Sequence, residues 1–249
     1  MKAIILAAGQ GTRLRPLTND KPKCMVEYSG KPIIRYIIDT IKNSGIKKTA
    51  IVNGYRNSVL ESYLAQENID WFTNEKYDST NMVTTFFCAS KYFDDDLVVS
   101  YADIIYKQEI LDALISSKGD FSVVVDRNWE ELWKLRMEDP LQDAETLKIN
   151  NGKIIELGKK ASNLGEIEGQ YIGLFKISRE ALAKIKDYYY SLDKNSIYDG
   201  QSYDNMYMTS LIQLVIDNIL DVEPVFINGG WFEIDSAHDL EIYEKKKLI

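Results

Sequence analysis

The sequence predicts an α/β fold, with a Rossmann-like, mixed but mostly parallel sheet flanked by helices. Three observations support this class. Short apolar runs alternate with helix-period segments through the first half of the chain, as in strands joined by crossover helices. The second half carries a hairpin signature, which adds antiparallel pairing to the sheet. The 249 residues contain no repeat, low-complexity segment or long linker, so we expect a single domain over residues 1–249.

The first half supplies four apolar runs that we expect to be strands buried on both faces. They are residues 4–8, 49–52, 97–100 and 121–125. A helix is expected over residues 32–44, because Pro32 favours a first helical turn and Gly45 ends the helix. The remaining crossover segments are residues 58–64, 82–92 and 108–116.

The second half begins with turn residues 150–152 between two apolar segments, 146–149 and 153–157, which predicts a β-hairpin. A strand is expected next, followed by a helix that Ser178 caps and that extends toward Tyr190. Ser236 and Asp239 have the spacing of a capping box, so the last helix should begin there. The other expected elements are strand 170–177, helix 206–218 and extended segments 225–227 and 231–234.

The chain carries 30 basic and 38 acidic side chains, a net charge of -8. An acidic surface repels phosphate backbones and no basic stripe compensates, so we expect no nucleic-acid partner. No apolar run reaches about 18 residues, and the first strand ends in a charged loop, so we expect neither a membrane span nor a signal peptide. Cys24 and Cys88 lie in unrelated contexts, which argues against zinc and fits a cytoplasmic location.

A glycine-containing loop, residues 9–14, directly follows the first buried strand. Glycines there let backbone N–H groups approach a phosphate chain closely. Two familiar phosphate loops do not match. The dinucleotide fingerprint needs a small residue where Leu14 stands, and a P-loop needs a Gly-Lys-Ser/Thr sequence. The two glycines by themselves are equally compatible with a tight structural turn.

The longer stretch Leu6-Ala-Ala-Gly-x-Gly-Thr-Arg-Leu-x-Pro-Leu-Thr18, followed by Lys21-Pro-Lys23, is far more specific than its glycines. It resembles the signature of nucleotidyltransferases that join a nucleoside triphosphate to a sugar phosphate or an alcohol phosphate. The resemblance implies that the loop wraps the triphosphate while Arg13 and Lys23 neutralise its phosphates. Loop residues near the strand ends would contact the base, with Asn81 the strongest candidate. The implied nucleotide-binding residues are Leu6, Ala8, Gly9, Gly11, Thr12, Arg13, Lys23, Gly54, Thr80, Asn81, Ala102 and Asp103.

Two carboxylates are candidate metal ligands. Asp103 lies just beyond the 97–100 strand, at the sheet edge where open α/β folds place ligands, although it could instead cap a turn or a helix. Asp235 ends the last extended segment, and Glu233 shares its face. In the family that the signature resembles, aspartates at these two positions hold Mg²⁺ against the α-phosphate, so we expect Mg²⁺ as the cofactor. The expected catalytic residues are Arg13, Lys23, Asp103 and Asp235.

The rest of the chain resembles the small CTP-dependent cytidylyltransferases that act on phosphocholine, 2-aminoethylphosphonate or phosphoglutamine. Residues 166–175 lack the Glu-Pro...Tyr-Val-Gly-Gly block typical of the sugar-nucleotide branch. The closer resemblance is carried by residues 100–104, 132–136, 140–148, 154–161, 170–175 and 205–210. It implies transfer of CMP from CTP to a small phosphorylated acceptor, preferably L-glutamine phosphate, in the synthesis of a capsular phosphoramidate.

The resemblance assigns the nucleotide to residues 1–126, and the acceptor to residues 127–249 with the hairpin and the second metal ligand. An acceptor with an ammonium and a carboxylate requires charges of both signs. The second half could supply them from Arg127, Arg136, Lys159 and Lys160 beside Glu145 and Glu168. The expected acceptor-binding residues are Arg127, Trp129, Arg136, Lys160, Glu168 and Gln170. A choline acceptor would require an aromatic and acidic cage instead, which Trp129, Trp133 and Tyr203 could supply, so both acceptors stay open.

Two other classes of function also stay open. A sugar-1-phosphate nucleotidyltransferase would differ in its nucleotide preference. A non-catalytic nucleotide-sensing subunit would tend to lose the lysine or a metal aspartate, whereas this chain has Lys23, Asp103 and Asp235 together. The sequence also leaves a homo-oligomer open. The single histidine, His238, is expected to be a solvated residue of the last helix rather than a catalytic base.

Overall fold

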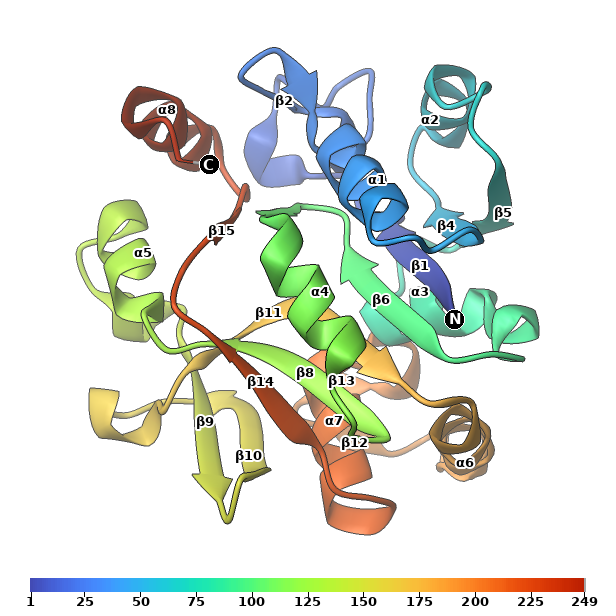
Figure 1. Ribbon diagram of the computed structural model, residues 1–249, viewed down its shortest axis with the longest axis vertical. Coiled ribbons are helices and arrows are strands. Elements are labelled where there is room, and N and C mark those ends of the chain that lie inside the picture. The colour runs from blue at the N-terminus through green and yellow to red at the C-terminus, as the bar shows by residue number, and fades with distance from the viewer. Residues whose placement is uncertain (249) are drawn as a thin grey trace.

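A seven-stranded sheet forms the centre of the protein, as the computed structural model of residues 1–248 shows (Figure 1). The strand order is β14-β8-β11-β6-β1-β4-β5. Neighbouring strands run parallel except at β11, which is antiparallel to both β6 and β8. The strands are β1 Lys2–Ala7, β4 Thr49–Asn53, β5 Ile69–Thr73, β6 Leu97–Tyr101, β8 Phe121–Asp126, β11 Gln170–Ile177 and β14 Glu223–Ile227. The predicted mixed, mostly parallel fold class is confirmed.

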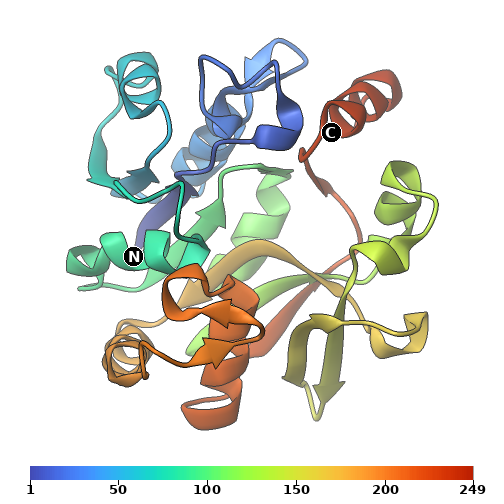
Figure 2. The same cartoon turned by 180° about the vertical axis from the view of Figure 1, so that it is seen from behind.

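Helices cover both faces of this sheet. The side chains of β1 alternate between two apolar clusters, because Ile5 faces one cluster and Ile4 faces the other. Helices α1 and α4 pack on the first face, and α3, α6 and α7 pack on the second (Figures 1 and 2). The helices are α1 Ile33–Asn43, α2 Asn57–Tyr63, α3 Met82–Cys88, α4 Gln108–Ser116, α5 Trp129–Arg136, α6 Arg179–Ser191, α7 Met208–Asn218 and α8 Ala237–Lys246.

The element boundaries differ from the predictions mostly at helix ends. The helix predicted from residue 32 begins at Ile33, with Pro32 just before it, and α7 begins two residues later than expected. The segment 82–92 is α3 followed by a separate 3-10 turn, Ser90–Tyr92. The capping box at the start of α8 is confirmed, because Ser236 accepts from the Asp239 amide and Asp239 accepts from the Ser236 amide. No helix in residues 1–248 is long and apolar enough to span a bilayer.

The hairpin forms as predicted, but the prediction that its pairing joins the main sheet was wrong. Strands β9 Glu145–Asn150 and β10 Lys153–Lys160 form a separate two-stranded sheet, and the antiparallel member of the main sheet is β11. Two irregularities in its register bend β10 away, toward α7. Gly158, at φ 88°, permits this contact, because a Cβ there would lie only 2.4 Å from Thr209 Cβ.

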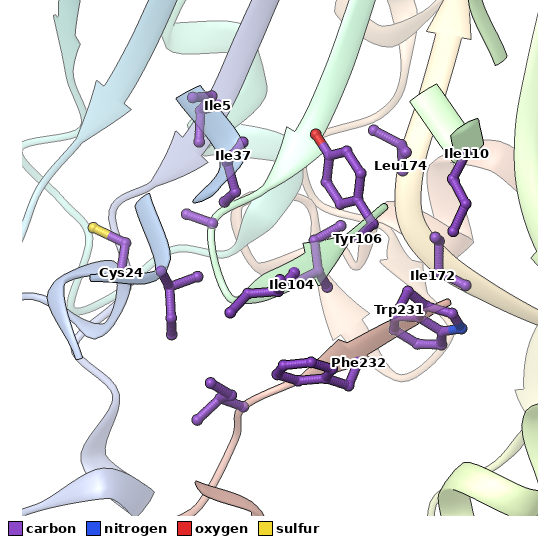
Figure 3. Packing of buried hydrophobic residues seen from close by; sticks show 14 of the residues in the cluster. Ile5, Cys24, Ile37, Ile104, Tyr106, Ile110, Ile172, Leu174, Trp231 and Phe232 are labelled. Carbon is purple, nitrogen blue, oxygen red and sulfur yellow. The ribbon is translucent and has the colours of Figure 1, made fainter. Parts of the chain in front are cut away.

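Sequence reasoning missed the strands that lack a long apolar run, among them β5 and β7 Ile104–Tyr106. Edge strand β5 is only half-buried, so it lacks the continuous apolar run that marks its neighbours. Strand β7 is three residues long and pairs antiparallel with β15 Trp231–Glu233. Figure 3 shows Ile104 and Tyr106 of β7 beside Trp231 and Phe232 of β15. Two further pairs of two-residue strands complete the fold: β2 Glu27–Tyr28 with β3 Lys31–Pro32, and β12 Ile197–Tyr198 with β13 Gln201–Ser202.

The β7–β15 ladder determines where the candidate carboxylates lie. It starts directly after β6, pairs Glu233 with Ile104, and continues with a hydrogen bond from the Ile234 amide to the Asp103 carbonyl (3.0 Å). Residues more than 100 positions apart in the chain therefore meet at the carboxyl end of β6. This edge of the sheet is where the candidate site lies.

Candidate active site

The loop after β1 is held in a single tight conformation. Gly11 has φ 63°, and its carbonyl accepts a hydrogen bond from Thr18 Oγ1 (2.8 Å). A Cβ at Gly11 would lie 3.0 Å from Lys23 Cβ. Both the positive φ and the lack of room for a side chain therefore favour glycine at this position. Leu14 is fully buried, whereas Thr12 and Arg13 are exposed. The leucine that excluded a dinucleotide fingerprint therefore anchors the loop in the core.

The four residues expected to be catalytic come together. Lys23 Nζ lies 2.6 Å from Asp103 Oδ2 and also pairs with Asp235 Oδ1. Arg13 Nη2 lies 3.0 Å from Asp235 Oδ2. Asp103, Glu233 and Asp235 each offer an oxygen within 4.8 Å of the others, so Glu233 belongs to the same cluster. In this arrangement Lys23 neutralises two of the three carboxylates.

The charges in this cluster are unequal. Burial opposes a charged Lys23, but Asp103 and Asp235 outweigh burial and raise the pKa of its ammonium. Burial likewise opposes ionisation of Asp235, and Lys23 outweighs it and lowers the pKa of that carboxyl. For Glu233, burial and the carboxylates of Asp235 and Asp103 raise the pKa well above its ordinary value, so Glu233 favours its neutral form.

The cluster suits a hard divalent cation. All three candidate ligands offer oxygen atoms, which Mg²⁺ prefers. Asp103 Oδ1 is buried and has no hydrogen-bond partner within residues 1–248, so it has lone pairs free for a cation. A buried acceptor without a partner is costly, and a bound cation would remove that cost.

Arg136, one of the expected acceptor-binding residues, lies behind the carboxylates. Its side chain is 3% exposed and faces three acids, with Nη2 3.4 Å from Asp235 Oδ2, Nη1 3.6 Å from Glu233 Oε2 and Nε 3.3 Å from Asp239 Oδ1. Asp239 in turn accepts from the Asp235 amide (3.0 Å) through its other oxygen. Asp235 is thus fixed through both its backbone and its side chain.

A first cavity of about 110 Å³ opens beside Lys23 and Asp103. Most of the expected nucleotide-binding residues line it: Leu6, Ala8, Gly9, Lys23, Thr80, Asn81, Ala102 and Asp103. Asn81 caps α3 by accepting from the Met82 amide (2.8 Å). Gly54 lies behind this wall, where a Cβ would come within 3.0 Å of Ala8 Cβ and 2.7 Å of Tyr77 Cβ.

A second cavity of about 240 Å³ adjoins the first, because Asn81 and Met82 line both. Glu233 and Asp235 lie in its wall, so the carboxylate cluster stands between the two cavities. Its other acids are Asp143 and Glu145. Five aromatic rings also line it, those of Tyr101, Trp133, Tyr171, Tyr207 and Trp231.

Of the six expected acceptor-binding residues, Gln170 lines the second cavity. It holds the backbone of Glu145, because its amide accepts from the Glu145 N–H (3.2 Å) and donates to the Glu145 carbonyl (2.5 Å). Lys160 is exposed on β10, opposite Glu145 in the ladder. Glu168 accepts from the Ile149 amide (3.0 Å).

The remaining expected acceptor contacts lie elsewhere. Arg127 stacks on Phe226, with its guanidinium 3.6 Å from the ring centre. Trp129 is buried and packs edge-on against Trp133, so only the second of these rings faces the cavity. Tyr203 stacks on Tyr189 in the cluster on the opposite face of the sheet. The three rings considered for a choline cage therefore do not converge.

Sequence reasoning missed the aromatic wall formed by Tyr101 and Tyr171. The signal was Gly173, which lies in β11 at φ 82°. A Cβ there would lie 2.6 Å from the Tyr101 ring, and the register of β11 against β8 is irregular between Tyr171 and Phe175. A glycine inside a strand often marks a bulge or a close approach, and here it marks the wall of the cavity.

Comparison with known proteins identifies the family. The model of the nucleotidyl transferase family matches residues 2–131. The CTP:phosphoglutamine cytidylyltransferase of Campylobacter jejuni is 50% identical, covering 99% of this chain and 100% of that protein. The choline-phosphate cytidylyltransferase of Streptococcus pneumoniae is 28% identical, covering 81% of this chain and 93% of that protein.

Solved structures share the fold. The inositol-1-phosphate CTP transferase of T. maritima superposes with a TM-score of 0.75 and 22% identity, covering 99% of this chain and 96% of that one. The CTP:phosphocholine cytidylyltransferase of Streptococcus pneumoniae superposes with a TM-score of 0.72 and 24% identity, covering 99% and 98%.

Proposed function

The chain belongs to the nucleotidyl transferase family, and we therefore propose that it transfers CMP from CTP to a small phosphorylated acceptor, with L-glutamine phosphate preferred. Pyrophosphate is the second product. The observation that carries this proposal is the placement of the carboxylate cluster between two adjoining cavities. The 50% identity to a CTP:phosphoglutamine cytidylyltransferase over nearly the whole chain supports CTP and phosphoglutamine as the substrate pair.

The reaction is one displacement at the α-phosphorus of CTP. An oxygen of the acceptor phosphate forms the new P–O bond, the bond to the bridging α–β oxygen breaks, and pyrophosphate leaves with the electron pair. The attacking oxygen is anionic at neutral pH, so the chain has no proton to remove. Catalysis then consists of positioning the two substrates and neutralising their charge.

Lys23 and Arg13 would neutralise the phosphates. Both are paired with acids, so the triphosphate would compete with Asp103 and Asp235 for these cations. Asp103 and Asp235 would hold Mg²⁺, with Glu233 as their neighbour. When bound, the metal would polarise the α-phosphate and neutralise the negative charge that develops on the leaving pyrophosphate.

A second candidate reaction is cytidylyl transfer to phosphocholine or 2-aminoethylphosphonate. The observation that favours it is the aromatic and acidic lining of the second cavity, which suits a cationic acceptor. The 28% identity to a choline-phosphate cytidylyltransferase points the same way.

A pyrophosphate-release assay separates these candidates. We expect turnover with CTP above UTP, dTTP and ATP, and turnover with L-glutamine phosphate above phosphocholine, 2-aminoethylphosphonate and glucose 1-phosphate. Asp103→Asn is the matched control and should lose turnover. Preference for UTP or dTTP with glucose 1-phosphate would assign a sugar-1-phosphate nucleotidyltransferase instead. Nucleotide binding with no turnover for any pair would assign a nucleotide-sensing subunit.

A further inference from the structure

The second cavity has an uneven distribution of charge. Four carboxylates line it, those of Asp143, Glu145, Glu233 and Asp235, and its lining contains no lysine or arginine. Arg136 reaches Glu233 and Asp235 from behind, but it contacts neither Asp143 nor Glu145 in the part of the chain that the structure describes. The part of the wall remote from the carboxylate cluster is therefore acidic, and no lysine or arginine side chain lines it.

Glu145 is the open acid in that remote wall. It is half-buried, and its carboxylate makes no hydrogen bond or ion pair with any residue in 1–248. By contrast, Asp143 is exposed, and its Oδ2 accepts from Trp133 Nε1 (3.1 Å). The backbone of Glu145 is fixed on both sides by Gln170, so the carboxylate has a set position but no partner.

Aromatic rings connect Glu145 to the carboxylate cluster. Tyr101 packs edge-on against Tyr171, with 5.9 Å between ring centres, and both line the cavity. Burial raises the pKa of each phenol, and the fields of Glu145 and Asp103 raise both further. The two rings therefore share the cavity wall with Glu145 and offer aromatic surface to a cationic ligand.

We propose that Glu145 is the residue that selects the acceptor: its carboxylate binds the ammonium group of an aminated phosphate whose phosphate end lies at Asp235. This inference rests on the proposed function and adds the residue that recognises the cationic nitrogen that the candidate acceptors share. Desolvation of a half-buried carboxylate that has no partner is unfavourable, and an ammonium ion in the cavity offsets that cost through a charge-assisted hydrogen bond.

The pKa of Glu145 supports this role. Burial, then Asp143 and Asp199, raise it from 4.5 to about 7. The other groups that face Glu145 are Tyr101 and Tyr171, which stay neutral at that pH, and Lys160 of the paired strand, which forms no ion pair with it in residues 1–248. Glu145 is thus partly protonated near neutral pH, and binding of an ammonium ion favours release of that proton.

Binding titrations test the proposal through the fluorescence of Trp133 and Trp231, which line the cavity. The probes are three pairs: L-glutamine phosphate, phosphocholine and 2-aminoethylphosphonate, each with an analogue in which a neutral group replaces the cationic nitrogen. Glu145→Gln should weaken binding of the preferred cationic probe about 10- to 100-fold and its neutral analogue less than about twofold. Glu156→Gln, on the same hairpin but paired with Lys148 and Lys159, is the matched control and should change neither.

The pH profile distinguishes ammonium binding from a structural role. In the wild type, affinity for the cationic probe should rise between pH 6 and 8 as Glu145 ionises, beyond any rise seen for the neutral analogue with the same phosphate. Glu145→Gln should abolish this difference. Equal loss of both members of the pair in Glu145→Gln, or no preference of the wild type for a cationic member in any pair, would overturn the proposal.

The outcomes also separate this inference from the proposed function. If the wild-type protein prefers cationic probes but releases no pyrophosphate from CTP, the ammonium site is supported and the proposed reaction is contradicted. If the wild-type protein turns over CTP equally with both members of each pair, the proposed reaction is supported and the ammonium site is contradicted.

Discussion

Asp235 is held in place by contacts on every side. Lys23 and Arg13 pair with its carboxylate from the front, and Arg136 pairs with it from behind. Asp239 holds its amide and also accepts from Arg136. One residue at the start of α8 therefore caps the helix, fixes a candidate metal ligand and orients a buried guanidinium.

Replacement of Arg136 should destabilise the protein strongly. Arg136→Gln leaves three clustered carboxyl groups without their shared cation, and breaking a buried charge cluster costs about 3–5 kcal/mol. Urea unfolding at pH 7 measures the change. Lys134→Gln on the same helix removes an exposed i,i+4 pair with Glu130 and should cost less than about 1 kcal/mol. Equal costs for the two variants would contradict this account of Arg136.

Glu145 should lower stability at high pH. Its pKa is raised from 4.5 to about 7 in the folded protein, so the unfavourable burial of charge is absent below pH 4.5 and complete above pH 7. Glu145→Gln should therefore raise the free energy of unfolding at pH 8, by on the order of 1–2 kcal/mol, and change it little at pH 4.5. Urea titrations at the two pH values provide the measurement. A variant that is less stable than wild type at pH 8 would show that Glu145 has a partner in the folded protein.

Among the secondary-structure elements, the short β7–β15 ladder is the one that brings the site together and that the sequence did not predict. The apolar runs were sufficient to place β1, β4, β6 and β8, because parallel strands buried on both faces leave a continuous signal. Strand β7 is too short for such a signal, and its partner lies more than 100 residues away. Asp103 and Asp235 were identified from motifs, but their proximity depends on this ladder.

The same limit explains the acceptor side. Arg127, Trp129 and Glu168 have the right chemistry for an amino-acid phosphate, yet each is used in a local contact: stacking on Phe226, packing on Trp133, and capping of the Ile149 amide. Composition shows which charges exist, whereas the direction of each side chain depends on helix and strand packing. Glu145 and Gln170 face the cavity because β9 and β11 begin beside it.

The bulge in β11 should be sensitive to one methyl group. Gly173→Ala combines positive φ with a Cβ 2.6 Å from the Tyr101 ring, so it should displace that ring and destabilise the protein by about 2–4 kcal/mol. Gly30→Ala is the matched control, since Gly30 has φ 75° but nothing within 4 Å of its Cβ, and should cost about 1 kcal/mol. Thermal unfolding compares the two. A Gly173→Ala variant no less stable than Gly30→Ala would show that Tyr101 moves without cost.

At the scale of the whole molecule, a chain of net charge -8 must bring together two anionic substrates. The structure resolves this locally, because Lys23, Arg13 and Arg136 surround the acids that lie between the cavities. The net charge therefore describes the surface and says little about the site. The sheet edge gathers groups from both halves of the chain, as Figure 1 shows for β15 and β6.

Direct transfer of CMP from CTP to the acceptor phosphate predicts the stereochemistry at the α-phosphorus. A single in-line displacement inverts the configuration at the α-phosphorus, so CTP with a chiral α-thiophosphate should give an inverted CMP-thio adduct. The configuration of the product, established by ³¹P NMR, provides the measurement. Retention would require two displacements and a covalent CMP–enzyme intermediate, and would contradict direct attack by the acceptor phosphate.

The central claim is that this protein joins CMP to a phosphorylated amino compound. The most direct measurement is a ³¹P NMR time course of wild-type protein with CTP, L-glutamine phosphate and Mg²⁺. We expect a CMP adduct and pyrophosphate to appear in equal amounts, with neither formed by Asp235→Asn. Unchanged substrates in the wild-type sample, or CMP and pyrophosphate without an adduct, would contradict it.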